Sequence, residues 1–404
     1  MVTNRKQGRF ADNVDLKQRK ALLTQAFLDR FDRSPTVWSR APGRVDLMGS
    51  HTDYNEGYVM TMAIDRDTWV AARPRTDRKV TIYSLNLKGG GEFDLDDIVH
   101  DAISPWTEYV RGVAKVFQDA GFLLAGFDGL IHSTIPFGSG LSSSAALEVA
   151  TAMLFKLLSG WQIEKTALAL LCQRAENEFV GMNCGILDQY SSVLAQAGCA
   201  LLLDCRHLTG SLANLPQGIQ VVICDTQAKR ELTGSEYGQR RAQCEAGARR
   251  FAEFYPGVTH LRDVSLAQFV QHEANLPDLV AKRCRFIIEE NRRVLDLAEA
   301  LSNDDLAAIG RLTAESYAGA RDLYEISSPE MAVMMQAMGQ GPGVVGARQA
   351  GAGFGGCMVA FVENEAVAAF ANHVKQLYRA ATAIEPKVYP VQAAAGAGPL
   401  DLPL

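Results

Sequence analysis

The sequence predicts a two-domain protein of the mixed α and β (α+β) class. Short apolar runs of strand length alternate with longer segments of helical periodicity along the chain. With 404 residues and 48% hydrophobic content, the chain is long enough for two domains with full cores. The segment 207–218, HLTGSLANLPQG, is rich in turn-forming residues. We therefore expect an N-terminal domain over 1–207 and a C-terminal domain over 208–404.

The N-terminal half is expected to open with a helix, to continue with strands and then to return to helices. Apolar runs bounded by turn residues predict the strands, and apolar positions at i, i+3 and i+4 spacing predict the later helix. In chain order, the predicted elements are a helix over 17–31; strands over 56–65, 67–75, 79–86 and 126–136; a helix ending near 158; a helix over 164–180; and a strand over 199–206.

The C-terminal half is expected to be mainly helical, with strands near its start and its end. It contains neither an internal repeat nor a low-complexity tract. In chain order, the predicted elements are a strand over 219–226; a helix from about 235 to 254; several helices up to 338; a strand, loop and strand over 344–362; a helix over 365–380; and a strand over 386–394.

Composition excludes several classes of protein. A formal net charge of −6 without a Lys/Arg block argues against nucleic acid as the main partner. No apolar run reaches 18 residues, so we expect no membrane partner, and the polar stretch 1–20 lacks the apolar core of a secretion signal. The eight cysteines occur singly, without a C-x-x-C pair, which disfavours a zinc site. They predict buried thiols in a cytoplasmic protein.

A cluster of polar side chains lies within residues 40–64, RAPGRVDLMGSHTDYNEGYVMTMAI. Glycines separate its charged and polar members, which are Arg44, Asp46, His51, Asp53 and Asn55. An ordinary surface loop can have this composition. The combination of a cation, acids and an imidazole at the junction of a strand and a turn favours a polyhydroxylated ligand, because each sugar hydroxyl can donate and accept at once.

A second cluster, PFGSGLSSSAALEVA over 136–150, places glycines and serines directly before a helix. The first amides of a helix lack internal partners and carry partial positive charge, so they can hold a phosphate group. The plainer alternative is a glycine turn followed by a serine cap. The common phosphate-loop motif G-x-x-x-x-G-K-[ST] is absent, so another donor must neutralise the phosphates.

A third cluster, GARQAGAGFGGCMVAF over 346–361, has five glycines between two strand-like flanks. By itself it indicates only a tight hairpin. Together with GRVDLMGSHTDYNEG and the Gly/Ser loop, it resembles the three signatures of the galactokinase family, which is part of the GHMP family of small-molecule kinases. The likeness continues through CGILDQY, GSEYGQRRAQCE, RCRFIIEENRRV and RDLYEISSPEM, and so covers nearly the whole chain in the expected order.

The resemblance implies the GHMP kinase fold. Its N-terminal domain would hold a mixed sheet with helices, its C-terminal domain an antiparallel sheet with helices, and the active site would lie between them. The implied reaction is the ATP-dependent phosphorylation of the anomeric hydroxyl of galactose or a close relative, with ATP and Mg²⁺ as cofactors. The protein would be a monomer or a weak homodimer.

The resemblance also implies roles for single residues. Asp188 would accept the proton of the anomeric hydroxyl, and Arg44 beside it would counter charge on the phosphate. Ser144 and Glu176 would hold Mg²⁺. Trp106 and Tyr109 would lie near the adenine, with a role in the core as the alternative. The ATP phosphates would be wrapped by Gly138, Ser139, Gly140, Leu141, Ser142, Ser143 and Ser144. The sugar would be held by Arg44, Ser50, His51, Asp53, Gly185, Asp188 and Tyr237.

The chain departs from the family pattern G-R-V-N-L-I-G-E-H-T-D-Y-N at two positions. It has Asp46 in place of Asn and Ser50 in place of the Glu that would bind the hydroxyl on carbon 6. L-Arabinose, which lacks carbon 6, and galacturonate are therefore alternative substrates. A non-catalytic sensor of sugar and ATP is an alternative of another class. The presence of Arg44, Glu176 and Asp188 favours catalysis.

Overall fold

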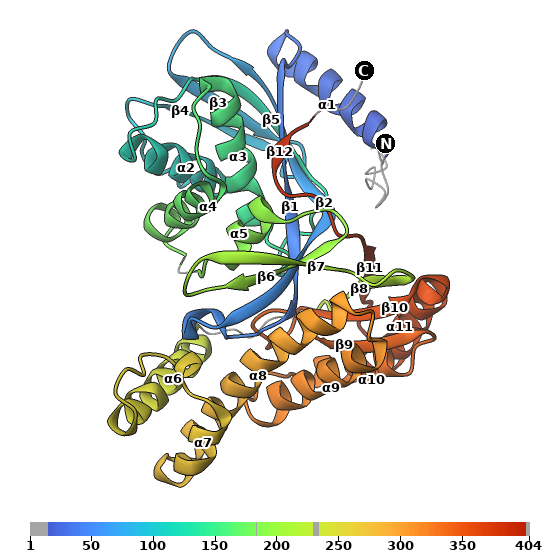
Figure 1. Ribbon diagram of the computed structural model, residues 1–404. Helices are drawn as coiled ribbons and strands as arrows, with labels where there is room; N and C mark the ends of the chain where they lie inside the picture. Colours follow the sequence, from blue (N-terminus) through green and yellow to red (C-terminus); the bar gives the residue numbers. More distant parts are fainter. Residues whose placement is uncertain (1–14, 183, 229–233, 401–404) are drawn as a thin grey trace.

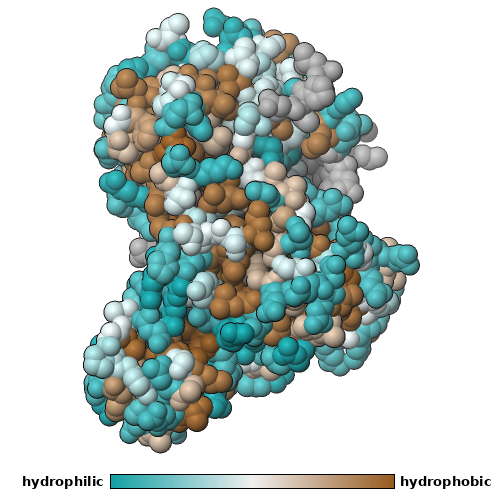
Figure 2. Space-filling view, viewed as in Figure 1, coloured by the Kyte–Doolittle hydropathy of each residue, from teal (hydrophilic) through white to brown (hydrophobic). Residues whose placement is uncertain are grey.

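The computed structural model describes residues 15–182, 184–228 and 234–400, and its two lobes meet at a narrower waist (Figures 1 and 2). The polar stretch in which we expect no secretion signal lies mostly outside the described residues. Hydrophilic side chains cover most of the face seen in Figure 2. Within the described residues, no helix is both long enough and apolar enough to cross a lipid bilayer.

The N-terminal lobe is built on an eight-stranded sheet with the order β12-β1-β2-β5-β3-β4, to which β6 and β7 are joined through β2. The β3–β5 pair is parallel and the other pairs are antiparallel, which confirms the predicted mixed sheet. The strands are β1 (Val37–Met48), β2 (Tyr58–Pro74), β3 (Lys79–Ser84), β4 (Gly89–Asp94), β5 (Phe127–Ser133), β6 (Cys199–Asp204), β7 (Thr209–Asn214) and β12 (Gly398–Pro399).

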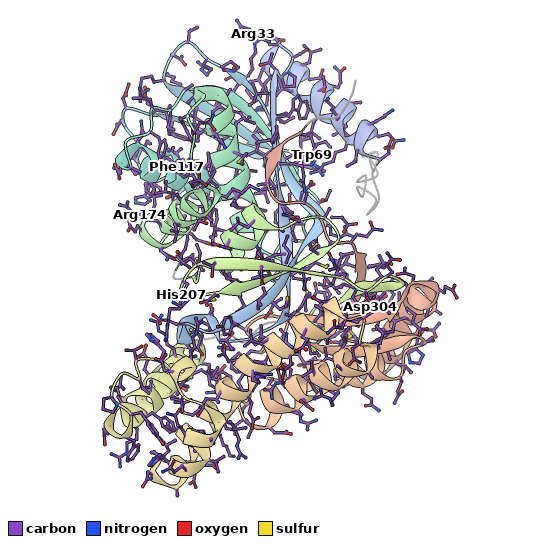
Figure 3. All side chains as sticks on the ribbon, viewed as in Figure 1. Arg33, Trp69, Phe117, Arg174, His207 and Asp304 are labelled. Carbon is purple, nitrogen blue, oxygen red and sulfur yellow. The ribbon has the colours of Figure 1, made fainter. Side chains whose placement is uncertain are left out.

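Helices pack against this sheet. The central helix α3 contacts β1 and β2, and the other helices of its layer pack around it. The helix α1 packs separately, and its Leu23 and Phe27 enclose Trp69 of β2, which is labelled in Figure 3. The helices are α1 (Leu16–Phe31), α2 (Glu108–Asp119), α3 (Ser143–Ser159), α4 (Lys165–Arg174), which continues as a π-helical turn (Ala175–Val180), and α5 (Leu187–Leu194).

The C-terminal lobe has a four-stranded antiparallel sheet with the order β11-β8-β10-β9, as predicted. Its long helix α8 contacts both α9 and strands of the first sheet, so it joins the two lobes. The elements are β8 (Ile219–Asp225), α6 (Gly234–Phe254), α7 (Leu266–His272), α8 (Asp278–Ser302), α9 (Leu306–Asp322), α10 (Pro329–Gly339), β9 (Val344–Gln349), β10 (Cys357–Glu363), α11 (Val367–Thr382) and β11 (Lys387–Val391).

The N-terminal lobe differs from the sequence expectations in several elements, and the helices α2 and α5 and the strands β4 and β12 were not predicted. The runs 56–65 and 67–75 are one strand, β2, because Asp67 at the start of the second run is paired with Arg19 and Arg40 and can be buried. The strand β1 was not predicted, and a register shift at Pro42 lets it pass a residue that has no amide proton.

The turn-rich segment 207–218 contains strand β7, paired with β6. The chain passes from the first sheet to the second between β7 and β8, and it returns at the end, where β12 pairs with β1. The domain boundary after residue 207 stays a prediction.

Candidate active site

The Gly/Ser loop leads directly into the N-terminus of α3. Gly138 and Gly140 have φ values of 71° and 80°, and Ser142 has a φ of 59°. Ser142 stands at the N-cap position but makes no side-chain cap hydrogen bond, and its buried Oγ has no partner. Because the serine does not cap the helix, the first amides of α3 are available to an anion, as the phosphate interpretation requires.

Arg44 joins this loop to Asp188. Its Nη1 donates to the carbonyl oxygen of Gly140 at 2.7 Å, while Nε and Nη2 donate to Asp188 Oδ1 at 2.8 and 2.5 Å. Both bonds go to Oδ1, so neither occupies Oδ2. Asp188 lies in the first turn of α5, where the helix dipole favours a negative charge. The fold thus brings together the two predicted catalytic residues and the predicted phosphate loop.

A cavity of about 220 Å³ opens beside this pair. It is lined by Arg44, Asp46, Gly49, Ser50, His51, Asp53, Cys184, Gly185, Leu187, Asp188, Tyr237, Gly351 and Ala352. All seven predicted sugar-binding residues are in this set. We call this cavity the sugar pocket.

Asp53 lies at the wall of the sugar pocket beside Gly185. A Cβ atom at Gly185 would stand only 2.6 Å from Asp53 Oδ2, so glycine is needed for this close approach. Burial raises the pKa of Asp53 to about 6, and the nearby carboxylates Asp46 and Asp188 add to the rise. Asp53 is therefore ionised at neutral pH and can accept hydrogen bonds from sugar hydroxyls.

A buried charge cluster lies behind Ser50. Arg348 Nη2 donates to Ser50 Oγ at 2.8 Å and to Glu290 Oε1 at 3.2 Å. The Ser50 hydroxyl faces Asp46 Oδ2 at 3.4 Å, so its own proton points toward that carboxylate. Asp46 Oδ1 and Arg348 Nη1 stand 3.9 Å apart. The small residue at position 50 is thus part of an ionic network that also contains the Asp at position 46.

Glu176, predicted to hold metal, lies in the π-helical turn that follows α4. Turns of this kind are frequent at functional sites. Glu176 is within hydrogen-bonding reach of Ser144, its predicted co-ligand. Its Oε2 accepts from Gln189 Nε2 at 2.6 Å, and the same amide donates to the buried Glu148 at 2.9 Å.

Burial raises the pKa of Glu176. A cation bound there would stabilise its ionised form. The described residues contain no group of three or more His, Cys, Asp or Glu side chains arranged to hold a metal ion. This donor set fits a hard cation that takes few protein oxygens and completes its shell with phosphates and water.

A smaller cavity of about 150 Å³ adjoins the start of α3 and is lined by Trp106, Tyr109, Phe137, Ser143 and Ser144, among others. Trp106 also packs against the hydrophobic core of the lobe. The pocket role and the core role that the sequence left open are therefore compatible. The position next to the Gly/Ser loop fits a planar base attached to the phosphates.

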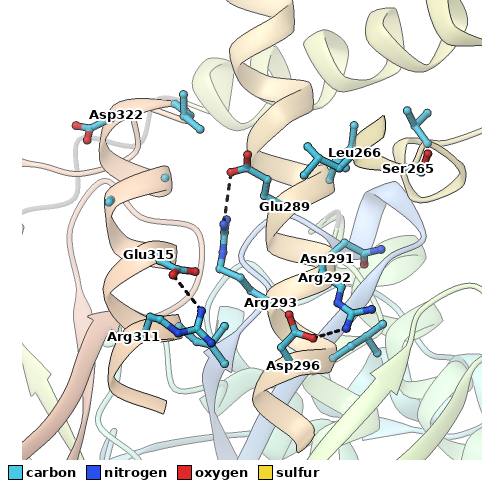
Figure 4. Close-up of a pocket in the computed structure, with 17 residues that line it drawn as sticks. Ser265, Leu266, Glu289, Asn291, Arg292, Arg293, Asp296, Arg311, Glu315 and Asp322 are labelled. Carbon is cyan, nitrogen blue, oxygen red and sulfur yellow. Dashed lines mark hydrogen bonds and ion pairs between the residues drawn. The ribbon is translucent and has the colours of Figure 1, made fainter. Parts of the chain in front are cut away.

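A groove of about 860 Å³ lies between α8 and α9, and Figure 4 shows its side chains. Its charges form pairs along the helices, which are Arg292–Asp296, Arg293–Glu289 and Arg311–Glu315. It contains none of the residues of the three sequence clusters. The volume of a cavity therefore does not by itself identify the site. The polar groups that converge on the sugar pocket make that pocket the candidate site.

Several residues of the site were missed by sequence reasoning. Gly351 and Ala352, from the third glycine cluster, line the sugar pocket, although the cluster by itself indicated only a hairpin. The five glycines of that cluster were the signal that could have found these two residues. Arg348 and Glu290 lay in motifs that carried the resemblance, but their burial behind the pocket had no sequence signal.

Comparisons with known proteins agree on one family. Family models match as the galactokinase galactose-binding signature over residues 25–74, the GHMP kinases N terminal domain over 108–196 and the GHMP kinases C terminal over 297–380. The chain is 45% identical to the galactokinase of Roseiflexus sp. (strain RS-1) over 93% of its own length and 96% of that relative. It is also 45% identical to the galactokinase of Chloroflexus aggregans, over 85% of its length and 88% of the relative.

Solved structures give the same picture. Lactococcus lactis galactokinase complexed with galactose is 33% identical and superimposes with a TM-score of 0.87, covering 93% of this chain and 98% of that one. Methanococcus jannaschii mevalonate kinase, at 18% identity, superimposes with a TM-score of 0.62 and covers 90% of this chain and 99% of that one, a likeness of fold.

Proposed function

The chain belongs to the galactokinase family of GHMP kinases, and on this premise we propose that it transfers the γ-phosphoryl group of ATP to the anomeric hydroxyl of galactose. The products are galactose 1-phosphate and ADP. The observation that carries the proposal is the position of Arg44, which bonds both the carbonyl of Gly140 in the Gly/Ser loop and the carboxylate of Asp188 beside the sugar pocket. A phosphate donor and a sugar acceptor can meet only at such a junction.

Asp188 orients the anomeric hydroxyl and receives its proton on Oδ2 as the phosphoryl group moves. A carboxylate is a weak base, so the proton is transferred late, after the bond between the γ-phosphorus and ADP is largely broken. Arg44 holds the Asp188 carboxylate in place through its two hydrogen bonds to Oδ1 and counters the charge that develops on the transferring group. The amides at the start of α3 hold the ATP phosphates in line with the acceptor oxygen.

Ser144 and Glu176 are the side chains that would hold Mg²⁺. When bound, the ion would neutralise phosphate charge. Ser144 also lies in the first turn of α3, the helix proposed to receive the phosphates, so one short segment would serve both ligands. Trp106 and Tyr109 would cover the adenine from the adjoining cavity.

No comparison favours the alternatives of L-arabinose, galacturonate or a non-catalytic sensor. For the compartment, we infer the cytoplasm. All eight cysteines are present as thiols, which is typical of a reducing environment. The prediction that they are buried holds for five of them, whereas Cys184, Cys199 and Cys205 are half-buried. A monomer or weak homodimer remains our expectation for the assembly.

A coupled assay of ADP release tests the proposal. With ATP and Mg²⁺, galactose should be turned over in preference to L-arabinose, galacturonate and N-acetylgalactosamine, and ³¹P NMR should identify the product as a sugar 1-phosphate. Asp188→Asn, which keeps the size of the side chain, should lower kcat by at least about 100-fold without loss of the folded state. Turnover by this variant at the wild-type rate would contradict the assignment of the base, and absence of sugar-dependent ADP release by the wild type would contradict the function.

A further inference from the structure

His51 lies at the wall of the sugar pocket in a backbone conformation that non-glycine residues rarely adopt. Its φ is 64°, in the left-handed region. Its carbonyl oxygen accepts from Asn55 Nδ2 at 2.9 Å, and the residue is 5% exposed. Such a conformation persists only where contacts with the surrounding structure enforce it. The contacts of the imidazole ring therefore indicate the role of His51.

Protein groups engage both ring nitrogens of His51. Nε2 lies 2.9 Å from the carbonyl oxygen of Ala352, and Nδ1 lies 2.9 Å from the hydroxyl oxygen of Tyr54. A carbonyl oxygen can only accept, so in a neutral ring Nε2 carries the proton and Nδ1 accepts from Tyr54. The ring then has no nitrogen left for a sugar hydroxyl.

The surroundings of the ring favour its neutral form. Burial lowers the pKa of His51 to about 4; the bond to Ala352 opposes this shift, and the positive charge of Arg240 on α6 adds to it. The other titratable groups that face the ring are the phenols of Tyr54, Tyr237 and Tyr324. These phenols carry no charge at neutral pH, so they do not stabilise an imidazolium.

A chain of single protons fixes the direction of the remaining bonds. The hydroxyl of Tyr54 donates its only proton to His51, so it must accept a hydrogen bond from the hydroxyl of Tyr324 at 2.7 Å. Because the proton of Tyr324 is donated to Tyr54, the hydroxyl oxygen of Tyr324 accepts a hydrogen bond from the thiol of Cys244, 3.1 Å away. The order is Cys244 to Tyr324 to Tyr54 to His51 to Ala352, and it links α6 and the segment after α9 to the glycine-rich loop.

The glycine-rich loop between β9 and β10 needs such ties. Gly351, Gly353, Gly355 and Gly356 all have positive φ, and glycines lose more conformational freedom on ordering than other residues. The neighbouring amide of Gly351 donates to Asp46 Oδ2 at 3.2 Å across the sugar pocket. Holding the carbonyl of Ala352 therefore also holds the amide of Gly351 against Asp46.

We propose that the imidazole ring of His51 is a positioning group, and that its two nitrogens do not bind sugar hydroxyls. As the Nε2–H tautomer, it holds the Ala352 carbonyl and so fixes the glycine-rich loop as one wall of the sugar pocket. The carbonyl of Ala352, which can only accept, selects that tautomer, and the hydroxyls of Tyr54 and Tyr324 complete the chain of hydrogen bonds behind the ring. The inference rests on the proposed function for its kinetic consequences, whereas the tautomer can be observed without any turnover.

NMR of ¹⁵N-labelled histidine tests the tautomer directly. The chain has seven histidines, and the signals lost in His51→Gln assign the ring. We expect Nε2–H and a free-base Nδ1 between pH 8 and pH 5.5, without titration. An Nδ1–H tautomer, or titration near pH 6.5, would overturn the proposal even if the enzyme proves inactive on galactose.

Two substitutions of His51 separate positioning from backbone strain. The glutamine amide reaches the place of Nε2 and can still donate to Ala352, whereas the asparagine amide reaches only the place of Nδ1. Asparagine tolerates a left-handed backbone better. If the hydrogen bond to Ala352 positions the loop, His51→Gln should keep kcat/KM for galactose within about 10-fold of wild type. His51→Asn should lower kcat/KM by more than that. The reverse order would overturn the proposal.

Tyr54→Phe removes the donor to Nδ1 and leaves the packing of the ring. We expect KM for galactose to rise about 2- to 10-fold, with a smaller change in kcat. Tyr255→Phe is the matched control, because its hydroxyl bonds only the exposed Gln271 at 3.2 Å, and it should leave both constants unchanged. An active wild type whose KM does not respond to Tyr54→Phe would contradict the positioning role while leaving the proposed function intact.

Discussion

At the scale of single residues, the site depends on which charges are buried together. Arg348 is fully buried, forms ion pairs with Glu290 and Asp46, and donates a hydrogen bond to the hydroxyl of Ser50. Burial raises the pKa of Asp46, and Arg348 and Arg44 oppose the rise. The residue at position 50 therefore cannot be changed without changing the charge balance of the whole cluster.

The charge balance predicts the effect of Ser50→Glu. This substitution adds a carboxylate beside Asp46 and Glu290, so it should lower the free energy of unfolding by about 2 kcal/mol. Asp46→Asn in the same chain removes the repulsion and should restore at least half of the loss. Urea unfolding of both single variants and the double variant measures the coupling. Additive effects within about 0.5 kcal/mol would show that the two positions do not interact.

The raised pKa of Asp53 predicts a pH limb in catalysis. The pKa is about 6 in the folded protein, so the carboxylate becomes protonated as the pH falls below that value and loses its capacity to accept two hydroxyl donors. We expect kcat/KM for galactose to fall as the pH is lowered through about 6. Asp53→Asn should lower kcat/KM at pH 8 by about 10- to 100-fold and flatten this limb. A limb that survives in the variant would assign it to another group.

At the scale of elements, the start of α3 lacks two features that usually stabilise the N-terminus of a helix. Its N-cap serine makes no capping bond, and no acidic residue lies in its first turn. Both features leave the positive end of the helix dipole uncompensated. An anion that binds there supplies the missing compensation.

Ser143→Asp should therefore have opposite effects on stability and on ATP binding. A carboxylate in the first turn should raise the unfolding free energy of the free protein by about 0.3–1 kcal/mol. It should raise KM for ATP by at least about 10-fold, because it repels the phosphates. Ala368→Asp is the control, because α11 also lacks an acidic residue in its first turn. It should stabilise similarly and leave KM for ATP unchanged. Equal effects on KM would show that α3 does not receive the phosphates.

At the scale of the whole molecule, ion pairs join the helical part of the C-terminal lobe to the first sheet. Arg262 donates to both carboxylate oxygens of Asp204, at 2.6 Å for Nη2 to Oδ2, and to the hydroxyl of Tyr58 at 2.7 Å. Burial would raise the pKa of Asp204, but its hydrogen bonds to Arg262 and His207 outweigh burial and lower it. The pair therefore stabilises the contact between the lobes where Asp204 is ionised.

Arg262→Ala should lower the unfolding free energy at pH 7 by about 2 kcal/mol, because a paired carboxylate loses its partner. The depressed pKa of Asp204 contributes stability that is present above the unfolded pKa and is lost as the pH falls below it. The difference between wild type and variant should thus shrink below about pH 4. Arg241→Ala, which breaks the exposed pair with Glu245, should change stability by less than about 0.5 kcal/mol. A difference that stays constant down to pH 2 would contradict the role of Asp204.

The sequence by itself determined the class of the fold, most helices and strands, the family and the set of polar residues that line the sugar pocket. Periodicity, turn residues and short motifs are local, so they can be read without knowing the contacts between distant segments. The domain boundary and the individual roles of the site residues stay predictions.

Only the tertiary structure decided which distant groups share one site. Arg44 and Asp188 are 144 residues apart, and Ser50 and Arg348 are 298 residues apart. The tertiary structure also shows that β2 is a single strand, that the turn-rich segment contains the strand β7, and that the glycine-rich hairpin contacts His51. Burial and charge pairing across such separations depend on the packed molecule, because no local pattern records the partner of a buried charge.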